Sequence, residues 1–525
     1  MHGASLRSAW PGIVAAALCA LFALACMRFV WQPTLASFAD DSVSYLVMAQ
    51  VFSPYQAASP PVAAAFAREA FYPPLYPLLL ALAGAAHHAA WAHAVTALLL
   101  AASLPFAYLL GCRWLGSRGA ALAAVVCIAL LPSLWVNSKG ILSETLFCLL
   151  LVSTFLYLEK DRTASWALAL LLAAMALTRT AALPMLAGFA VWALTRHGIP
   201  LPERVRAVVP ALAAVIAYGL WVLLRPSMTE DDYARILVER GQGFLEGPGG
   251  MLASLAASLL RQANALAEGW VGTLTLFWVE GQPLRPLLAG VVGALALGGL
   301  ALRLARGRAD GWMMAAYLAT LLAWPFYEQM GRFLFPAVPV LVLYAFLAAG
   351  EALRRLARPA ALAHALLAAL LLTLSVPAMA FIYQRSQAVG PVVEMTEWYR
   401  TPDLARARSR SQVHLDLLDD MQAIRGLTQP QDRVMWVAPS YLALLAGRQG
   451  IAAPDARLGP EAYREAVRRS GADYVFLSRY HPRDTIRDTA WQSGIRALAA
   501  DAKAVHTRTQ DGGSIVSSIL LKAGK

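Results

Sequence analysis

The sequence has few charged residues and few cysteines. Only 14% of its 525 residues are Asp, Glu, Lys or Arg, whereas soluble domains average about 25%. The five cysteines lie in or beside apolar runs and form neither a disulfide framework nor a Cys-x-x-Cys metal site. The segments outside these apolar runs must therefore hold their shape by packing alone.

The sequence also lacks the marks of nucleic-acid and nucleotide binding. No basic patch is interleaved with exposed aromatic residues, so the net charge of +12 does not indicate nucleic-acid binding. No glycine-rich phosphate loop follows a predicted strand in the C-terminal part, so we expect no nucleotide site there. The basic balance has to be explained in another way.

Long apolar runs are abundant. The chain is 59% hydrophobic with a mean hydropathy of +0.54, and runs of roughly 17–25 apolar residues are long enough to cross a bilayer. We predict an α-helical polytopic membrane protein with about eleven spans, at residues 10–30, 89–111, 119–135, 141–158, 164–178, 181–195, 207–224, 283–302, 311–326, 333–353 and 360–382. The first run has no convincing small-residue cleavage site before Arg28, so we interpret it as a retained helix and not as a signal peptide.

The basic residues fall in alternate loops. By the positive-inside rule these loops face the cytoplasm. The set comprises Arg7, Arg113, Arg118, Lys160, Arg162, Arg196, Arg204, Arg206, Arg303, Arg306, Arg308, Arg354, Arg355 and Arg358. The N-terminus is then cytoplasmic, and residues 31–88, 225–282 and everything after 383 are periplasmic in a bacterial-type inner membrane.

Two external regions have recognisable organisation. Residues 42–52 have apolar side chains at helical spacing, which predicts a short helix along the membrane surface. Residues 225–282 contain the acidic cluster Glu230-Asp231-Asp232, a glycine-rich stretch and an amphipathic helix near 251–268. The acidic cluster is most simply explained as a solvated helix start.

The chain changes character after about residue 390. Charge rises, and strands are expected at 434–437, 474–477, 503–509 and 514–521, with helices at 412–426, 440–447 and 460–470. We therefore divide the chain into a transmembrane domain, 1–385, and a small soluble α/β periplasmic domain, 391–525.

Polar residues distant in sequence are predicted at one membrane face. Carboxylates there suit a general base or a divalent cation such as Mg²⁺ or Mn²⁺, and arginines suit a phosphate. The acids are Asp40, Asp41 and Glu144, and the arginines are Arg179 and Arg332. An acid-and-arginine site beside an apolar path suits an enzyme that takes a lipid-linked phosphate from the membrane.

Each of these residues also has a structural explanation. The aspartates would cap the surface helix, Glu144 would be a buried acid with its partners, and the arginines would anchor helix ends at the interface. His87, His88 and His93 have no metal-ligand spacing and are interpreted as interfacial or packing residues. The shared placement of the acids and arginines favours a common site.

The motifs resemble those of GT-C glycosyltransferases, of the protein O-mannosyltransferase and aminoarabinose-transferase-like group (glycosyltransferase family 39-like). The similarity covers roughly residues 10–350 and depends on the order of the motifs. They are Asp41-Ser42-Val43-Ser44-Tyr45, Tyr72-Pro73-Pro74-Leu75-Tyr76-Pro77, Leu142-Ser143-Glu144-Thr145, Leu177-Thr178-Arg179 and Arg332-Phe333-Leu334-Phe335-Pro336. Where the family has an Asp-Glu pair, this chain has Asp41 followed by Ser42, with Asp40 one residue early.

The resemblance implies transfer of a hexosyl or pentosyl group from a polyprenyl-phosphate donor, with inversion, to a glycan, lipid or protein acceptor. Asp41 is then the expected base, with Asp40 and Glu144 orienting the acceptor or holding the cation. Arg332 and Arg179 are expected at the donor phosphate. Tyr45, Tyr72 and Tyr76 complete the expected substrate-binding set.

Other classes stay open at this stage. An O-antigen-ligase-like enzyme would use external Arg and His residues instead of acids. A transporter would need charges near the bilayer midplane and paired broken helices. A non-catalytic envelope-assembly protein would use the C-terminal domain to bind a partner.

The topology is tested with a reporter that is active only in the periplasm. Fused after Lys525, it is expected to be active, because the alternation of basic loops places the C-terminus outside. The same reporter fused after Arg308, in a predicted cytoplasmic loop, is expected to be inactive. The reverse pattern would overturn the placement of the whole site.

Overall fold

The computed structural model describes residues 3–35, 40–160, 163–226, 251–276, 283–324, 326–387, 398–399, 402–455, 457–479, 484–498, 502–510 and 515–523. The acidic cluster Glu230-Asp231-Asp232 and the glycine-rich stretch after it lie outside these residues. The side chain of Asp40 also lies outside the described part.

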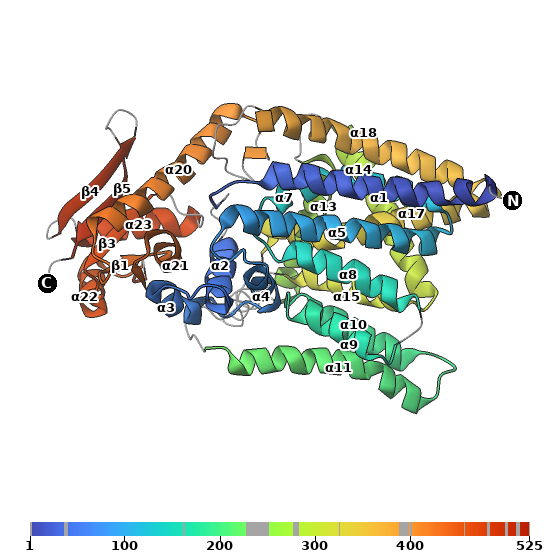
Figure 1. Ribbon diagram of the computed structural model, residues 1–525, viewed down its shortest axis with the longest axis horizontal. Coiled ribbons are helices and arrows are strands. Elements are labelled where there is room, and N and C mark those ends of the chain that lie inside the picture. The colour runs from blue at the N-terminus through green and yellow to red at the C-terminus, as the bar shows by residue number, and fades with distance from the viewer. Residues whose placement is uncertain are drawn as a thin grey trace.

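Most of the chain up to residue 387 forms a bundle of roughly aligned helices (Figure 1). Its helices are α1 (Gly3–Val30), α5 (Ala89–Leu115), α6 (Arg118–Ala129), α7 (Pro132–Ser138), α8 (Glu144–Leu158), α9 (Trp166–Ala176), α10 (Ala182–Thr195), α11 (Leu201–Leu224), α13 (Met251–Thr275), α14 (Leu284–Ala305), α15 (Ala309–Ala323), η1 (Tyr327–Gln329), α16 (Met330–Leu334), η2 (Phe335–Ala337), α17 (Val338–Arg355) and α18 (Ala360–Gln387). Each predicted span overlaps at least one of these helices.

Within the described residues, six helical segments are long and apolar enough to cross a membrane, and the pair α6 and α7, bent by 51°, would make a seventh. Helices α8, α9 and α10 are apolar but shorter. The segment Met330–Arg355 is central, since 94% of its apolar stretch is buried, whereas α11 is only 22% buried and exposes leucines along its length. These spans confirm the prediction of an α-helical polytopic membrane protein.

Three short helices connect the bundle with the C-terminal part. They are α2 (Asp40–Phe52), α3 (Pro60–Glu69) and α4 (Leu75–Leu82), drawn in blue between the bundle and the orange and red C-terminal region in Figure 1. The predicted helix at 42–52 therefore exists. It does not lie on a surface, however, because residues 42–49 are buried.

The C-terminal part is a five-stranded sheet with helices. It contains α20 (Leu404–Leu427), β1 (Arg433–Trp436), α21 (Pro439–Tyr441), η3 (Leu442–Ala446), β2 (Gln449–Ala452), α22 (Pro460–Ser470), β3 (Tyr474–Ser478), α23 (Asp484–Leu498), β4 (Lys503–Gln510) and β5 (Ile515–Lys522). The strand order is β2-β1-β3-β5-β4, parallel over the first three strands and antiparallel at β5 and β4. The four predicted strands are present; β2, a short edge strand with Gly450 in it, was not predicted.

The C-terminal sheet and the short helices share one hydrophobic core. Apolar side chains of α2, α3 and α4 pack in a single cluster with side chains of α20, β1 and η3, among them Leu417, Met421, Trp436 and Leu442. A second, smaller core lies on the other side of the sheet, around Tyr463 and Trp491. The region that follows α1 is thus packed between bundle and sheet.

A buried ionic network holds together the end of the bundle that is remote from the sheet. Arg303 on α14 donates to both oxygens of Asp310 on α15, at 2.9 and 2.6 Å, and also to Glu159 at the end of α8. Glu159 further accepts from Trp114 on α5 at 2.8 Å, and Asp310 accepts from Tyr344 on α17 at 2.7 Å. Five helices therefore meet at one guanidinium group and its two carboxylates.

Replacing Arg303 tests this network. Arg303→Leu leaves Asp310 and Glu159 buried without their main cation, and breaking a buried pair typically costs roughly 3–5 kcal/mol. We expect a loss of that order in the free energy of unfolding, measured by SDS titration in mixed micelles. Arg306→Leu, at the C-terminal cap of the same helix and 45% exposed beside Glu351, is the matched control and should lose at most about 1 kcal/mol. Equal losses would contradict the interpretation.

Candidate functional site

Four segments distant in sequence meet at the end of the bundle that faces the C-terminal sheet. Arg332, on α16, joins two carboxylates: its Nη2 donates to Asp41 on α2 and its Nε donates to Glu144 at the start of α8. Arg179, between α9 and α10, forms an ion pair with the other oxygen of Glu144 at 2.9 Å. Acids and arginines thus alternate in the continuous order Asp41, Arg332, Glu144, Arg179.

Hydroxyl groups extend this chain at both ends. Tyr72 donates to the second oxygen of Asp41, Oδ1, at 2.5 Å. Arg179 also donates to the Ser143 hydroxyl at 3.0 Å, and that hydroxyl lies 2.8 Å from the hydroxyl of Tyr45. Both oxygens of Asp41 and Oε1 of Glu144 accept hydrogen bonds, whereas Oε2 of Glu144 has the ion pair with Arg179 but no hydrogen bond.

Local structure explains why these side chains converge. Asp41 occupies the first turn of α2 and Glu144 is the first residue of α8, so each lies at a helix N-terminus, where a carboxylate is stabilised. The Leu75 amide donates to the Leu177 carbonyl at 2.9 Å, which holds the end of the first long loop beside Arg179.

Arg332 is placed by a close backbone contact. A Cβ on Gly269 of α13 would lie 2.9 Å from the nitrogen of Gly331, the residue just before Arg332. Only glycine at this position lets α13 and α16 approach so closely. Gly331 itself is less crowded, since a Cβ there would lie 3.6 Å from the Cα of Gly269.

The charge balance favours an ionised Asp41. Burial alone would raise the pKa of Asp41, but the Arg332 guanidinium and the Tyr72 hydroxyl outweigh it, and the pKa lies below its ordinary value. The side chain is 21% exposed, that of Arg332 is 18% and that of Glu144 is 2%. Asp41 is therefore a carboxylate at neutral pH with limited access to water.

The three predicted tyrosines lie together but differ in their contacts. The ring of Tyr45 lies 5.0 Å from those of Tyr72 and Tyr76, centroid to centroid. Tyr45 and Tyr76 are buried, and the Tyr76 hydroxyl lies 2.6 Å from that of Thr96. Tyr72 packs against Tyr45 and donates its hydroxyl to Asp41. Substrate contact by any of the three tyrosines stays a prediction.

The remaining candidates lie elsewhere or outside the described part. Asp40 begins α2, but its side chain is not described. His93 on α5 is buried, with Gln32 at 3.5 Å and the Thr34 carbonyl at 3.1 Å as its partners. The ionic contacts of the site therefore join Asp41, Glu144, Arg179 and Arg332, whereas the contacts of His93 lie with Gln32 and Thr34.

The described carboxylates of the site, Asp41 and Glu144, do not fit a divalent cation as they stand. Calcium takes about six to eight oxygen ligands, and Mg²⁺ is commonly held by carboxylates and waters. Asp41 and Glu144 are instead bridged by the guanidinium of Arg332. No group of three or more His, Cys, Asp or Glu side chains that could hold a metal occurs among the residues that the structure describes.

Sequence reasoning missed two participants. Ser143 joins Tyr45 to Arg179, and its position next to Glu144 was the available signal. Glu69 accepts a hydrogen bond from Ser44, on the helix that carries Asp41. Nothing in the sequence around Glu69 indicated this contact.

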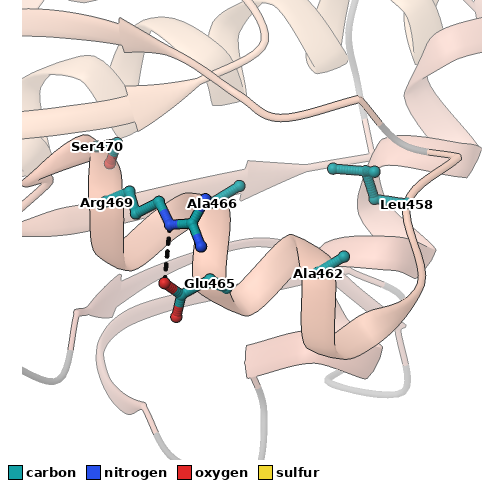
Figure 2. A pocket seen from close by; sticks show the side chains of 6 residues that line it. All are labelled: Leu458, Ala462, Glu465, Ala466, Arg469 and Ser470. Carbon is teal, nitrogen blue, oxygen red and sulfur yellow. Dashed lines mark hydrogen bonds and ion pairs between the residues drawn. The ribbon is translucent and has the colours of Figure 1, made fainter.

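A hollow on the C-terminal domain is separate from these residues. It has a volume of about 600 Å³ and is lined by Leu458, Ala462, Glu465, Ala466, Arg469 and Ser470 (Figure 2). Its charged pair is Glu465 and Arg469, joined at 2.8 Å one turn apart on α22 and largely exposed. An exposed pair of this kind contributes little and supplies no site chemistry.

Comparison with known proteins supports the fold. No family model matches the sequence, and no curated protein matches it. Among solved structures, the crystal structure of ArnT from Cupriavidus metallidurans in the apo state is similar, with a TM-score of 0.50 and 12% identity over 99% of this chain and 98% of that chain. The expected resemblance is thus confirmed at the level of the fold: this chain has an ArnT-like fold along nearly its whole length.

Proposed function

We propose that this protein transfers a sugar from a polyprenyl-phosphate donor to an acceptor at the outer face of a bacterial-type inner membrane. The observation that carries the proposal is the ionic chain from Asp41 through Arg332 and Glu144 to Arg179, built from four segments at one end of an apolar bundle. The ArnT-like fold supports a membrane glycosyltransferase of the GT-C type.

Asp41 is the proposed general base. The acceptor hydroxyl attacks the anomeric carbon, its oxygen forms the new glycosidic bond, and its proton passes to the Asp41 carboxylate. The bond between the anomeric carbon and the phosphate oxygen breaks, and its electron pair leaves with the polyprenyl phosphate. Attack opposite the leaving group inverts the anomeric configuration.

Arg332 is the proposed partner of the leaving phosphate. Its forked N–H groups suit a phosphate, and charge that develops there is stabilised by a fixed cation. In the structure these groups are bound to Asp41 and Glu144. A donor phosphate that takes over the Nη2 contact would leave Asp41 with fewer stabilising partners and make it a better base.

Glu144 and Arg179 are proposed to keep Arg332 in place. Glu144 is almost fully buried and bonded to both arginines, so it holds them at a fixed separation. The network of Glu159, Arg303 and Arg308 lies at the opposite end of the bundle. Since these arginines belong to the predicted cytoplasmic set, this arrangement supports an external site.

The general test is mass spectrometry of envelope lipids and glycans from cells with and without the gene. We expect one glycan or lipid species to gain a sugar only when the gene is present. An unchanged profile, with the protein present in the membrane, would argue against a transferase. The same species then serves as the product for the assays of variants.

Asp41→Asn separates the base from the structural roles of this residue. The amide keeps the shape and one acceptor oxygen but cannot take the proton, and a positioned base typically contributes a factor of about 10²–10⁴. We expect a folded, membrane-inserted variant with transfer reduced at least about 100-fold and donor binding largely kept. Asp455→Asn, at an exposed aspartate of the C-terminal domain, should behave as wild type.

The Asp41 result has two contrary outcomes. If Asp40→Asn abolishes transfer and Asp41→Asn does not, Asp40 is the base and the assignment is wrong by one residue. If neither variant affects transfer, the mechanism is wrong.

Arg332 is tested by a pair of substitutions. Arg332→Lys keeps the charge but loses the fork, so partial transfer should remain, whereas Arg332→Ala should be far lower. The measurement is the rate of product formation in membrane vesicles that contain their own lipid-linked donor. Arg469→Ala, whose side chain is 77% exposed, is the control. Wild-type rates for both variants would make Arg332 only an anchor of its helix end.

A further inference from the structure

A buried carboxylate connects the C-terminal domain with the helix that bears Asp41. Glu69, the last residue of α3, accepts a hydrogen bond from Ser44 of α2 at 2.5 Å through Oε2. Its other oxygen, Oε1, accepts from the Ser440 hydroxyl of α21, 371 residues further along the chain. Side chains from three segments thus meet at one acid.

All three residues are shielded from water. Glu69 is 7% exposed, Ser44 is 4% and Ser440 is 6%. Burying a carboxylate is costly unless its oxygens are hydrogen-bonded, so both serine contacts matter to the position of Glu69. Removing either serine hydroxyl would interrupt the path from Ser440 through Glu69 to Ser44.

The Ser440 end of this connection is rigid. A Cβ on Gly450 of β2 would lie 2.1 Å from the carbonyl oxygen of Pro439, so β2 and α21 are in close backbone contact. Parallel pairing of β2 with β1 then ties α21 to the sheet. The C-terminal domain has a second polar contact with the segment that follows α1, because Nε2 of His414 on α20 lies 2.5 Å from the Leu35 carbonyl oxygen.

The Ser44 end lies next to the proposed base. Ser44 follows Asp41 by three residues, nearly one helical turn, and Tyr45 beside it contacts Ser143 at 2.8 Å. Helix α2 is therefore held on one side by the bundle, through Tyr45, and on the other by the C-terminal domain, through Ser44. The position of Asp41 depends on both.

We propose that Glu69 is a positioning residue, and that Ser440, Glu69 and Ser44 transmit the placement of the C-terminal domain to α2 and so to Asp41. The proposal depends on the proposed function in one respect only, that α2 bears the base. Contact of an acceptor with the C-terminal domain could then alter the geometry at Asp41 without any residue of the domain entering the site.

The first test compares Ser440→Ala with Ser470→Ala. Ser470 is the last residue of α22 in the same domain, and its hydroxyl has local contacts, donating to the Val467 carbonyl and accepting from the Ala472 amide, so it is a matched control. Backbone hydrogen–deuterium exchange of residues 40–52 is measured in full-length protein, with residues 460–470 as reference. Ser440→Ala should speed exchange of the 40–52 segment about tenfold, as expected for loss of one buried hydrogen bond, and leave the reference segment unchanged.

The second test asks whether Ser440, Glu69 and Ser44 act along one path. Ser44→Ala should reproduce the effect of Ser440→Ala, and the double variant should be no worse than either single one, because either change breaks the same connection. The transfer rate at saturating donor should fall about tenfold with the apparent donor KM unchanged. Ser470→Ala should change neither value.

Two outcomes of the exchange measurement would overturn the proposal. One is wild-type exchange of residues 40–52 in Ser440→Ala, and the other is an equal acceleration of that segment and the reference, which would mean general destabilisation. Multiplying effects in the double variant would also show that the two serines act independently. Exchange needs no donor, so these results stand even if Asp41→Asn proves the proposed function wrong.

Discussion

The Arg332 guanidinium group is the contact on which the arrangement at this end of the molecule depends. It is bonded to Asp41 from the first long loop and to Glu144 from the bundle, while Arg179 neutralises the remaining charge of Glu144. With two acids and two arginines the cluster balances its charge, which is what allows it to lie at the end of an apolar bundle. Removing one member would leave a partly buried charge without its partner.

The same contact has consequences for chemistry. A carboxylate that accepts from Arg332 and Tyr72 is ionised but weakly basic, since its partners stabilise the charged form. A phosphate that competes for Arg332 changes that balance at the moment when a base is needed. The proposed mechanism therefore couples donor binding to the readiness of Asp41, through contacts that are present in the structure.

The short helices between bundle and sheet join the two structural regions next to the site. Their core contains side chains of the C-terminal domain, so α2 is packed on both sides and is not a loop resting on a membrane. Glu69 adds a polar connection inside this apolar core. At the far end of the bundle the Arg303 network holds five helices in register, and these helices carry Glu144 and lead to Arg332.

The sequence by itself determined the helical spans, four of the five strands, and the set of acids and arginines, because apolar run length, strand alternation and charge placement are local signals. It could not determine which atoms pair. The bond of Tyr72 to Asp41, the bridge by Arg332 across 291 residues, and the burial of α2 arise from packing between distant segments. The edge strand β2 and the role of Glu69 were equally out of reach, since a four-residue strand and one glutamate gain their meaning only from the neighbours that the tertiary structure places beside them.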